Sequence, residues 1–405
     1  MSDAGGPRFL PQIESLRGFA ALSVAFAHCG IVLLMYDGTI APNRPNAAAA
    51  WLLLPFDYLL NARAAVVVFF VISGLVLAMA LDRQPAHRSL VRLGGFLGRR
   101  ALRLYPAHVA ALCLFLPVAA LTIFQIPIHD PGGLEGPGPS LEYWAGRSVY
   151  GSFDPGAFIA SAALLGNYYN PPVWTLQVEL IGALCLPFFA ALSRPGRLGL
   201  DLASVVILFA IGASLDRGLG YSTMFVFLPA FYLGCMVRTH GRRLAALASA
   251  RSHGPGALVA TALLLLVVPE ALVGPVYAHQ LILLSMAVAS FAIVSALAWT
   301  SSRAIETVLL NPAARWVGRV SYSFYLWHAL VMFAVVRLEL AILPGELFGR
   351  WDQVLRALTF VVSSGIALAV AGLSYRWIER PFIALGRRTG APAPPLSATP
   401  LEAAR

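Results

Sequence analysis

The chain has 405 residues, of which 59% are hydrophobic and only 12% are charged, and its mean hydropathy is +0.74. A water-soluble domain carries about 25% charged residues, so this composition excludes a soluble enzyme, a disordered chain and a small disulfide-stapled domain. All 29 basic residues are arginines; with 19 acidic residues they give a net charge of +10. Because these arginines are spread over short segments between apolar runs, we expect no nucleic-acid partner.

Ten apolar runs are long enough to cross, or nearly cross, a bilayer. They cover residues 13–35, 56–81, 104–124, 172–192, 200–215, 221–238, 256–272, 280–299, 319–337 and 354–377. The sequence therefore predicts an all-α fold, a polytopic membrane protein built as a bundle of about ten transmembrane helices. We expect one membrane domain over residues 1–385 and a disordered cytoplasmic tail over 386–405, which is rich in Ala and Pro. A further apolar piece, 157–166, is too short to span and is expected to be re-entrant or interfacial.

The distribution of arginines predicts the orientation of these spans. With the N-terminus inside, 21 arginines lie in cytoplasmic segments and six lie on the opposite side. This bias agrees with the positive-inside rule and predicts that both termini are cytoplasmic. The longest exterior loop, 125–156, is rich in Gly and Pro and is long enough to form a lid or binding loop.

Arg17, His28, Arg63 and Glu179 are ionisable residues within the predicted spans, where an unpaired charge costs several kcal/mol. Arg17 and His28 are eleven residues apart, which places them on one face of the first helix, about 16 Å apart along its axis. Span direction and rise per residue place His28, Arg63 and Glu179 at one depth in the outer third of the membrane. Such a cluster offers a base, a carboxylate to orient it and a cation for developing negative charge. The alternative is a buried Arg63–Glu179 ion pair that holds helices together, with His28 as a packing contact.

Three further segments contain candidate site residues. Arg100 and Arg103 are neighbours on one helix face and precede Tyr105, an arrangement suited to a nucleotide carrying phosphates or to ordinary membrane anchoring. Ser73 belongs to a small-residue segment that is typical of close helix packing. His328 lies at mid-depth in the ninth span, as a ligand or as a hydrogen-bonded core histidine. The four cysteines lack C-x-x-C spacing, so we expect no metal site and no disulfide.

Taken in order, these motifs resemble the acyltransferase-3 family of integral membrane proteins. The resemblance covers Ile13 to Phe382 and includes six short motifs in the family's order. They are ESLRG at 14–18 with His28 following, FFVISG at 69–74, RRALRLYP at 99–106, WTLQVE at 174–179, GRVSYSFYLWH at 318–328 and YRWIERPF at 375–382. Each motif is weak alone, but six in one order make the match specific.

The resemblance implies roles for individual residues. His28 matches the family's essential histidine, Arg17 its paired arginine, and Arg100 with Arg103 its R-x-x-R for acyl-CoA. Glu179 matches the first of two acidic residues, and the second is replaced by Leu180. We expect His28, Glu179 and Arg17 to be the catalytic residues. We further expect Tyr105 and Ser73 to contribute to donor binding, and Arg63, Trp174 and His328 to substrate binding.

The function implied is an O-acyltransferase of the bacterial inner membrane that transfers groups other than amino-acyl groups. We expect it to move an acyl group, acetyl above all, from cytoplasmic acyl-CoA to a hydroxyl of an envelope or exported glycan or a lipid-linked saccharide. Acyl-CoA would be the donor substrate, and no permanently bound cofactor is expected. The alternative is a transporter or permease of a small anionic or acylated metabolite, because intramembrane Arg, Glu and His are equally expected there.

Overall fold

The computed structural model describes residues 10–34, 56, 59–82, 90–126, 150, 153–216, 220–250, 254–273, 279–300, 303–344, 347 and 351–389. These residues form helices joined by short turns, with no β-strand among them. The all-α fold class is therefore confirmed.

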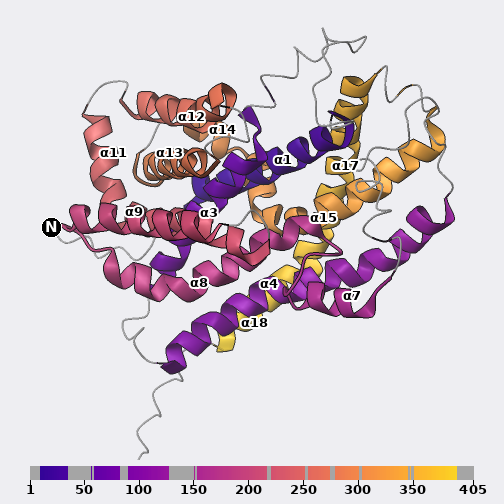
Figure 1. Cartoon of the computed structure of the whole chain (residues 1–405), viewed down its shortest axis with the longest axis horizontal. Helices are drawn as coiled ribbons and strands as arrows, with labels where there is room; N and C mark the ends of the chain where they lie inside the picture. The colour runs from indigo at the N-terminus through magenta and orange to yellow at the C-terminus, as the bar shows by residue number, and fades with distance from the viewer. Residues whose placement is uncertain are drawn as a thin grey trace, which may run out of the picture.

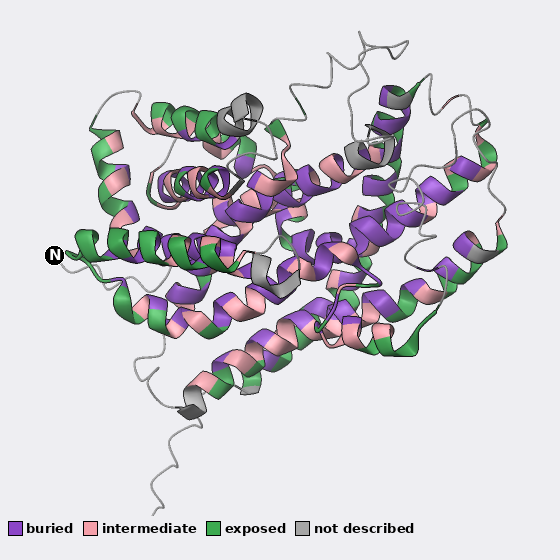
Figure 2. Ribbon diagram, in the orientation of Figure 1, coloured by how far each residue is buried: buried purple, intermediate pink, exposed green. Residues whose placement is uncertain are grey.

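The centre of the bundle is formed by α1 (Pro11–Leu34), α3 (Ala62–Asp82) and α15 (Pro312–Ile342), with α17 (Asp352–Ser374) beside them. Helix α15 packs against α1 and α17, and α3 packs against α1 (Figure 1). Figure 2 shows that α15 and α3 are mostly buried, whereas α9 (Leu198–Leu215) is mostly exposed. The predicted site residues on α1, α3 and α15 therefore face other protein helices.

The remaining helices surround this centre. They are α4 (Leu90–Ala119), continued by a π-helical segment Ala120–Gln125, α7 (Pro155–Ala162), α8 (Trp174–Leu192), α10 (Leu228–Met236), α11 (Arg242–Ser249), α12 (Gly254–Val273), α13 (His279–Trp299), α14 (Arg303–Leu309) and α18 (Arg380–Thr389). Helices α12 and α13 pack together on one side of α3, and α18 lies against α4 on the other (Figure 1).

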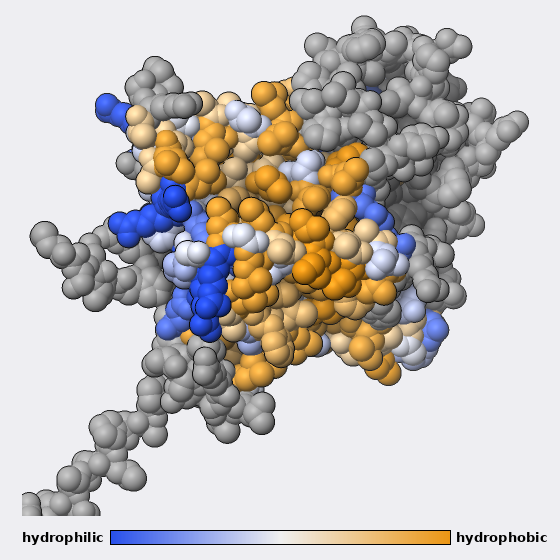
Figure 3. Space-filling model, turned by 60° about the vertical axis from the view of Figure 1, so that its left-hand side comes forward, coloured by the Kyte–Doolittle hydropathy of each residue, from blue (hydrophilic) through white to orange (hydrophobic). Residues whose placement is uncertain are grey.

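Seven helices within the described residues are long and apolar enough to cross a membrane. They lie within or around seven of the ten predicted spans, and the remaining three runs are also helical, in α1, in the segment 220–236 and in α12. Figure 3 shows a broad apolar band over one face, with hydrophilic side chains gathered at its left and right edges. The polytopic membrane architecture is therefore supported, while the count of ten spans stays a prediction.

Several predicted boundaries are wrong. The second span begins at Ala62, not at 56, because the Asn61 side chain accepts hydrogen bonds from the backbone amides of Arg63 and Ala64 and so caps the helix. Helix α4 begins at Leu90, so the arginine-rich segment before residue 104 is part of the same helix. Helix α18 ends at Thr389, four residues into the expected disordered tail. The rest of that tail, and most of the loop 125–156, lie outside the described residues.

Two pairs of glycines allow the central helices to approach closely. A methyl group on Gly18 of α1 would lie 2.7 Å from the backbone nitrogen of Gly318 on α15, and one on Gly318 would lie 2.5 Å from the carbonyl oxygen of Glu14. Gly74 of α3 and Gly234 of α10 face each other in the same way, each against the partner's backbone. Small residues at such contacts are typical of membrane helix packing, as predicted for the segment containing Ser73.

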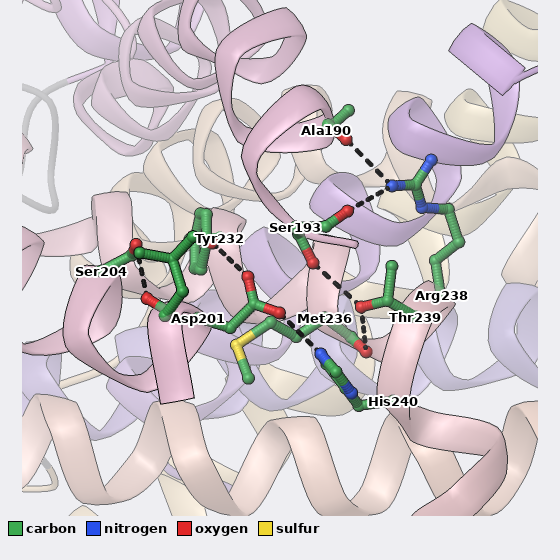
Figure 4. Close-up of polar contacts among 10 residues, drawn as sticks. Ala190, Ser193, Asp201, Ser204, Tyr232, Met236, Arg238, Thr239 and His240 are labelled. Atoms are coloured by element: carbon green, nitrogen blue, oxygen red, sulfur yellow. Dashed lines mark hydrogen bonds and ion pairs between the residues drawn. The ribbon is translucent and has the colours of Figure 1, made fainter. Parts of the chain in front are cut away.

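A polar cluster ties α8, α9 and α10 together at one end of the bundle (Figure 4). The buried carboxylate of Asp201 accepts a hydrogen bond from the hydroxyl of Tyr232 at 2.5 Å and lies 2.6 Å from Nε2 of His240. Arg238 donates to the carbonyl oxygens of Ala190 and Ser193 at the end of α8. Every carboxylate oxygen of Asp201 thus has a partner in this cluster, which we interpret as structural.

Candidate active site

Two histidines from the central helices form a direct pair. Nδ1 of His28 on α1 lies 3.1 Å from Nε2 of His328 on α15, and the two ring planes lie 13° apart with centroids separated by 5.2 Å. His28 is half-buried and His328 is 1% exposed. The close contact of Gly18 with Gly318 sets this pairing, because each histidine follows its glycine by ten residues on parallel helices.

Glu179 of α8 lies in a second polar group. Its carboxylate forms an ion pair with Arg100 of α4 and accepts a hydrogen bond from the hydroxyl of Ser73 at 2.9 Å. Arg100 is 8% exposed and the Glu179 side chain 16%, so this pair is largely desolvated. A buried carboxylate with these two donors is well satisfied.

The predicted depth of Glu179 is therefore wrong. It was expected in one layer with Arg63, but it is bound to Ser73, which lies ten residues, or about 15 Å, further along α3. The error comes from α8, which does not start at the outer surface. Asn170 donates to the carbonyl of Leu326 in the middle of α15, so the residues before Trp174 are already inside the bundle.

A large cavity opens at the end of the bundle where α1 and α15 begin. It has a volume of about 620 Å³, and five arginines and two glutamates line it. These are Arg17, Arg103, Arg319, Arg380 and Arg387, with Glu14 and Glu379. We call this space the arginine-lined cavity. Its excess of positive charge suits an anionic ligand.

A smaller space continues from this cavity into the bundle. This narrow pocket, of about 40 Å³, shares Arg17, Ser321 and Tyr322 with the arginine-lined cavity. Ser73, Glu179 and Tyr325 also line it, together with apolar side chains of α3. The ring of Tyr325 contacts that of His328, with centroids 5.2 Å apart. The two spaces together therefore lead from the arginine-rich end of the bundle to the ring of Tyr325, which lies against His328.

The structure brings together some predicted site residues and separates others. Arg17, Ser73 and Glu179 share the narrow pocket, and Arg103 lines the arginine-lined cavity. Tyr105 instead donates a hydrogen bond to the carbonyl of Ala163, 3.3 Å away. Trp174 packs on the ring of Phe227, and Arg63 lies in the first turn of α3, far along the helix from Ser73.

Several residues that line the arginine-lined cavity were not predicted from the sequence. Glu379 is buried and accepts a hydrogen bond from Ser323 at 2.7 Å, and Arg319 and Arg380 lie beside it in the lining. The motifs GRVSYSFYLWH and YRWIERPF contained all three residues. A buried glutamate among arginines at the basic end of a bundle was the signal that could have identified this lining. Within the described part of the chain, no group of three His, Cys, Asp or Glu side chains could hold a metal ion.

Comparison with known proteins identifies the family. The acyltransferase-3 family model, described as an acyltransferase domain, matches residues 10–376, nearly the whole bundle. The chain belongs to the acyltransferase-3 family. Acyltransferase MdmB of Streptomyces mycarofaciens is 26% identical over 424 residues, which cover 96% of this chain and 96% of that protein. No solved structure matches the chain.

The protein is therefore a membrane acyltransferase, an enzyme that transfers groups other than amino-acyl groups. Its full-length match to the family favours an enzyme over the alternative of a permease. The bundle presents three features that such an enzyme can use. They are a positively charged cavity at one end, a narrow extension from it, and a pair of imidazoles beyond that extension.

Proposed function

We propose that this acyltransferase moves an acetyl or similarly short acyl group from acyl-CoA to a hydroxyl of an envelope or exported glycan or lipid-linked saccharide. The observation that carries the proposal is the succession of the arginine-lined cavity, the narrow pocket and the His28–His328 pair. This succession supports a long donor whose charged end and reactive end lie far apart.

The donor would be held by its phosphates in the arginine-lined cavity. The volume of this cavity lies within the range of about 300–1,000 Å³ found for ligand pockets. Arg103, Arg319 and Arg380 offer guanidinium groups from three different helical segments, a geometry suited to several phosphates. Arg17 lies where the cavity meets the narrow pocket, about 16 Å from His28 along α1. We therefore assign Arg17 to donor binding, because it is too far from His28 to touch the same carbonyl.

The narrow pocket supports a short acyl group. Phe69, Phe70 and Tyr325 line it with aromatic rings, and it has room for little more than one small group. A thioester carrying an acetyl group requires the least space there. A long acyl chain would displace these rings, which pack against buried neighbours.

The chemistry would be a single acyl transfer assisted by a general base. His28 accepts the proton of the acceptor hydroxyl, and the oxygen attacks the carbonyl carbon of the thioester. The carbon–sulfur bond then breaks, and the departing thiolate takes the proton from the imidazolium. Glu179, Arg100 and Ser73 hold the wall of the narrow pocket in place. Arg63 and Trp174 remain candidates for acceptor contact, and Tyr105 for support of the donor site through α7.

This arrangement implies an orientation in the membrane. Acyl-CoA is a cytoplasmic metabolite, so the arginine-lined cavity would open to the cytoplasm. The excess of arginines on that side supports the same orientation, in a bacterial inner membrane with both termini cytoplasmic. No permanently bound cofactor is needed for this reaction.

The proposal is tested with the purified enzyme in proteoliposomes. Acetyl-CoA and saccharide acceptors are supplied, and free thiol and acetylated product are measured together. We expect thiol release that depends on the acceptor, with His28→Ala lowering the rate by about 10²–10⁴-fold. His240→Gln is the matched control, because it keeps a donor to Asp201 and lines neither the arginine-lined cavity nor the narrow pocket. Full activity of His28→Ala would refute the base assignment, and uptake of an anion without thiol release would favour the permease.

A further inference from the structure

We propose that His328 is a positioning residue that fixes the tautomer of His28 and stabilises its protonated form. This inference rests on the proposed function, in which His28 is the base. It assigns to a second imidazole the orienting role that sequence reasoning gave to Glu179. The carboxylate of Glu179 is instead engaged by Arg100 and Ser73.

The protonation of His328 follows from its own helix. Nδ1 of His328 lies 2.6 Å from the backbone carbonyl oxygen of Tyr325, three residues earlier on α15. A carbonyl oxygen only accepts hydrogen bonds, so Nδ1 must carry the proton and donate it. The residue is 1% exposed and packs on the rings of Phe324 and Tyr325, where an extra unpaired charge would be costly. The ring is therefore neutral, and its Nε2 carries a lone pair.

The tautomer of His28 follows from that of His328. Nδ1 of His28 faces the lone pair of His328 Nε2 at 3.1 Å. Two lone pairs at this distance would repel each other, so Nδ1 of His28 must carry a proton and donate it. In a neutral ring the remaining nitrogen, Nε2, then holds the lone pair. Nε2 of His28 is thus the basic nitrogen, as a general base requires.

The same hydrogen bond strengthens during the reaction. When Nε2 of His28 takes the hydroxyl proton, the ring becomes an imidazolium whose Nδ1–H points at a neutral acceptor. A hydrogen bond from a charged donor is roughly twice as strong as one between neutral groups. His328 therefore favours the transition state over the ground state, which is the condition for raising kcat and not merely lowering KM.

The position of His328 is itself well supported. Tyr325, whose carbonyl accepts from His328, donates its hydroxyl to the carbonyl of Pro172 at 2.9 Å and accepts from Thr175 at 2.9 Å. These contacts anchor this part of α15 to the beginning of α8. The rings of Phe324 and Tyr325 lie against that of His328 and restrict rotation of its imidazole. Precise orientation of a base is thereby built into the packing of three helices.

The kinetic experiment compares two variants of similar size in the purified enzyme. His328→Gln retains an acceptor oxygen near the position of Nε2, whereas His328→Leu removes it. In a Ser-His-Asp triad, loss of the correct tautomer lowers kcat by about 10⁴-fold. We expect His328→Leu to lower kcat by about 10²–10⁴-fold, with the KM for acetyl-CoA within about twofold, and His328→Gln to recover at least tenfold. Equal loss in both variants, or an unchanged kcat in His328→Leu, would overturn the assignment.

A spectroscopic experiment is independent of acyl transfer. Protein labelled with ¹⁵N at its eight histidines is examined by NMR, and the His28 signals are assigned by their loss in His28→Ala. We expect a protonated Nδ1 and an unprotonated Nε2 for His28, and a changed tautomer ratio in His328→Leu. A protonated Nε2 in the wild type would overturn the inference. Wild-type enzyme that shows the expected tautomer but no acyl transfer would instead contradict the proposed function alone.

Discussion

At the scale of single residues, Arg100 and Arg103 show how two arginines three positions apart on one helix have different tasks. Both belong to the R-x-x-R pattern from which a phosphate clamp was predicted. Arg103 lines the arginine-lined cavity, where an anionic donor would meet it. Arg100 is turned to Glu179 and is 8% exposed. Removal of Arg100 and removal of Arg103 should therefore affect different properties of the protein.

We expect Arg100→Ala to destabilise the protein and Arg103→Ala to weaken donor binding. Removing one partner of a buried ion pair costs about 3–5 kcal/mol, because the other charge stays buried without compensation. Arg103→Ala removes one phosphate contact and should raise the KM for acetyl-CoA by about tenfold at little cost in stability. Thermal unfolding in detergent and steady-state kinetics measure the two effects.

The double variant Arg100→Leu, Glu179→Leu is the control for this division. Since it removes both charges, we expect it to be more stable than either single variant. An Arg100→Ala protein that keeps its unfolding temperature but loses donor affinity would show that Arg100 binds phosphate as well.

Phe69 offers a test of the acyl group's size. Its side chain lines the narrow pocket and packs edge-on against Tyr325, with ring centroids 6.0 Å apart. We expect Phe69→Ala to raise kcat/KM for butyryl-CoA relative to acetyl-CoA by about tenfold, because each buried methylene contributes about 0.8 kcal/mol. The lipid-facing Ile207→Ala is the matched control, since Ile207 is 57% exposed on α9. An unchanged ratio in Phe69→Ala would place the acyl group elsewhere.

At the scale of helices, the contact between α1 and α15 determines whether the histidines meet. The backbones approach at Gly18 and Gly318, and the helices run in parallel from there for about 15 Å to His28 and His328. A side chain added at the glycines must push the helices apart or shift one along the other. The distance between Nδ1 of His28 and Nε2 of His328 then increases.

We expect Gly318→Ala to lower both stability and kcat. The added methyl group would lie 2.5 Å from the carbonyl oxygen of Glu14, and overpacking of this kind costs about 1–3 kcal/mol. Gly365→Ala on α17 is the matched control, because nothing lies within 4 Å of its added methyl group. Unfolding temperature and acetyl-CoA turnover are measured for both variants. Equal behaviour of the two would refute the role of the glycine contact in aligning the histidines.

At the scale of the whole molecule, apolar runs and arginine counts could predict the fold class and the placement of helices along the chain. They could not predict the depth in the membrane at which each helix begins. A run such as 172–192 looks like any other span, but its first residues lie inside the bundle because Asn170 bonds to Leu326. The partners of Glu179 and His28 depend on such long-range packing, which no periodicity within one helix contains. His328 was a candidate from its depth in the ninth span, and only the alignment of α1 with α15 makes it the partner of His28.

The orientation of the whole bundle gives the last prediction. If the arginine-lined cavity faces the cytoplasm, its lining must be protected from reagents outside the cell, while the far end must be accessible to them. Arg387 is exposed and lines the cavity, and Phe153 is 53% exposed just before α7.

Single cysteines are introduced at these two positions in a chain from which Cys29, Cys113, Cys185 and Cys235 have been removed. The cells are treated with a membrane-impermeant maleimide, after permeabilisation of the outer membrane if they have one. The maleimide should label Phe153→Cys, and it should label Arg387→Cys only after the inner membrane is opened. Acetyl-CoA added after opening should protect Arg387→Cys, because a ligand in the cavity covers its lining. The reverse labelling pattern would show that the topology is inverted. Acyl-CoA could then not reach the cavity from the side of the membrane on which it is made.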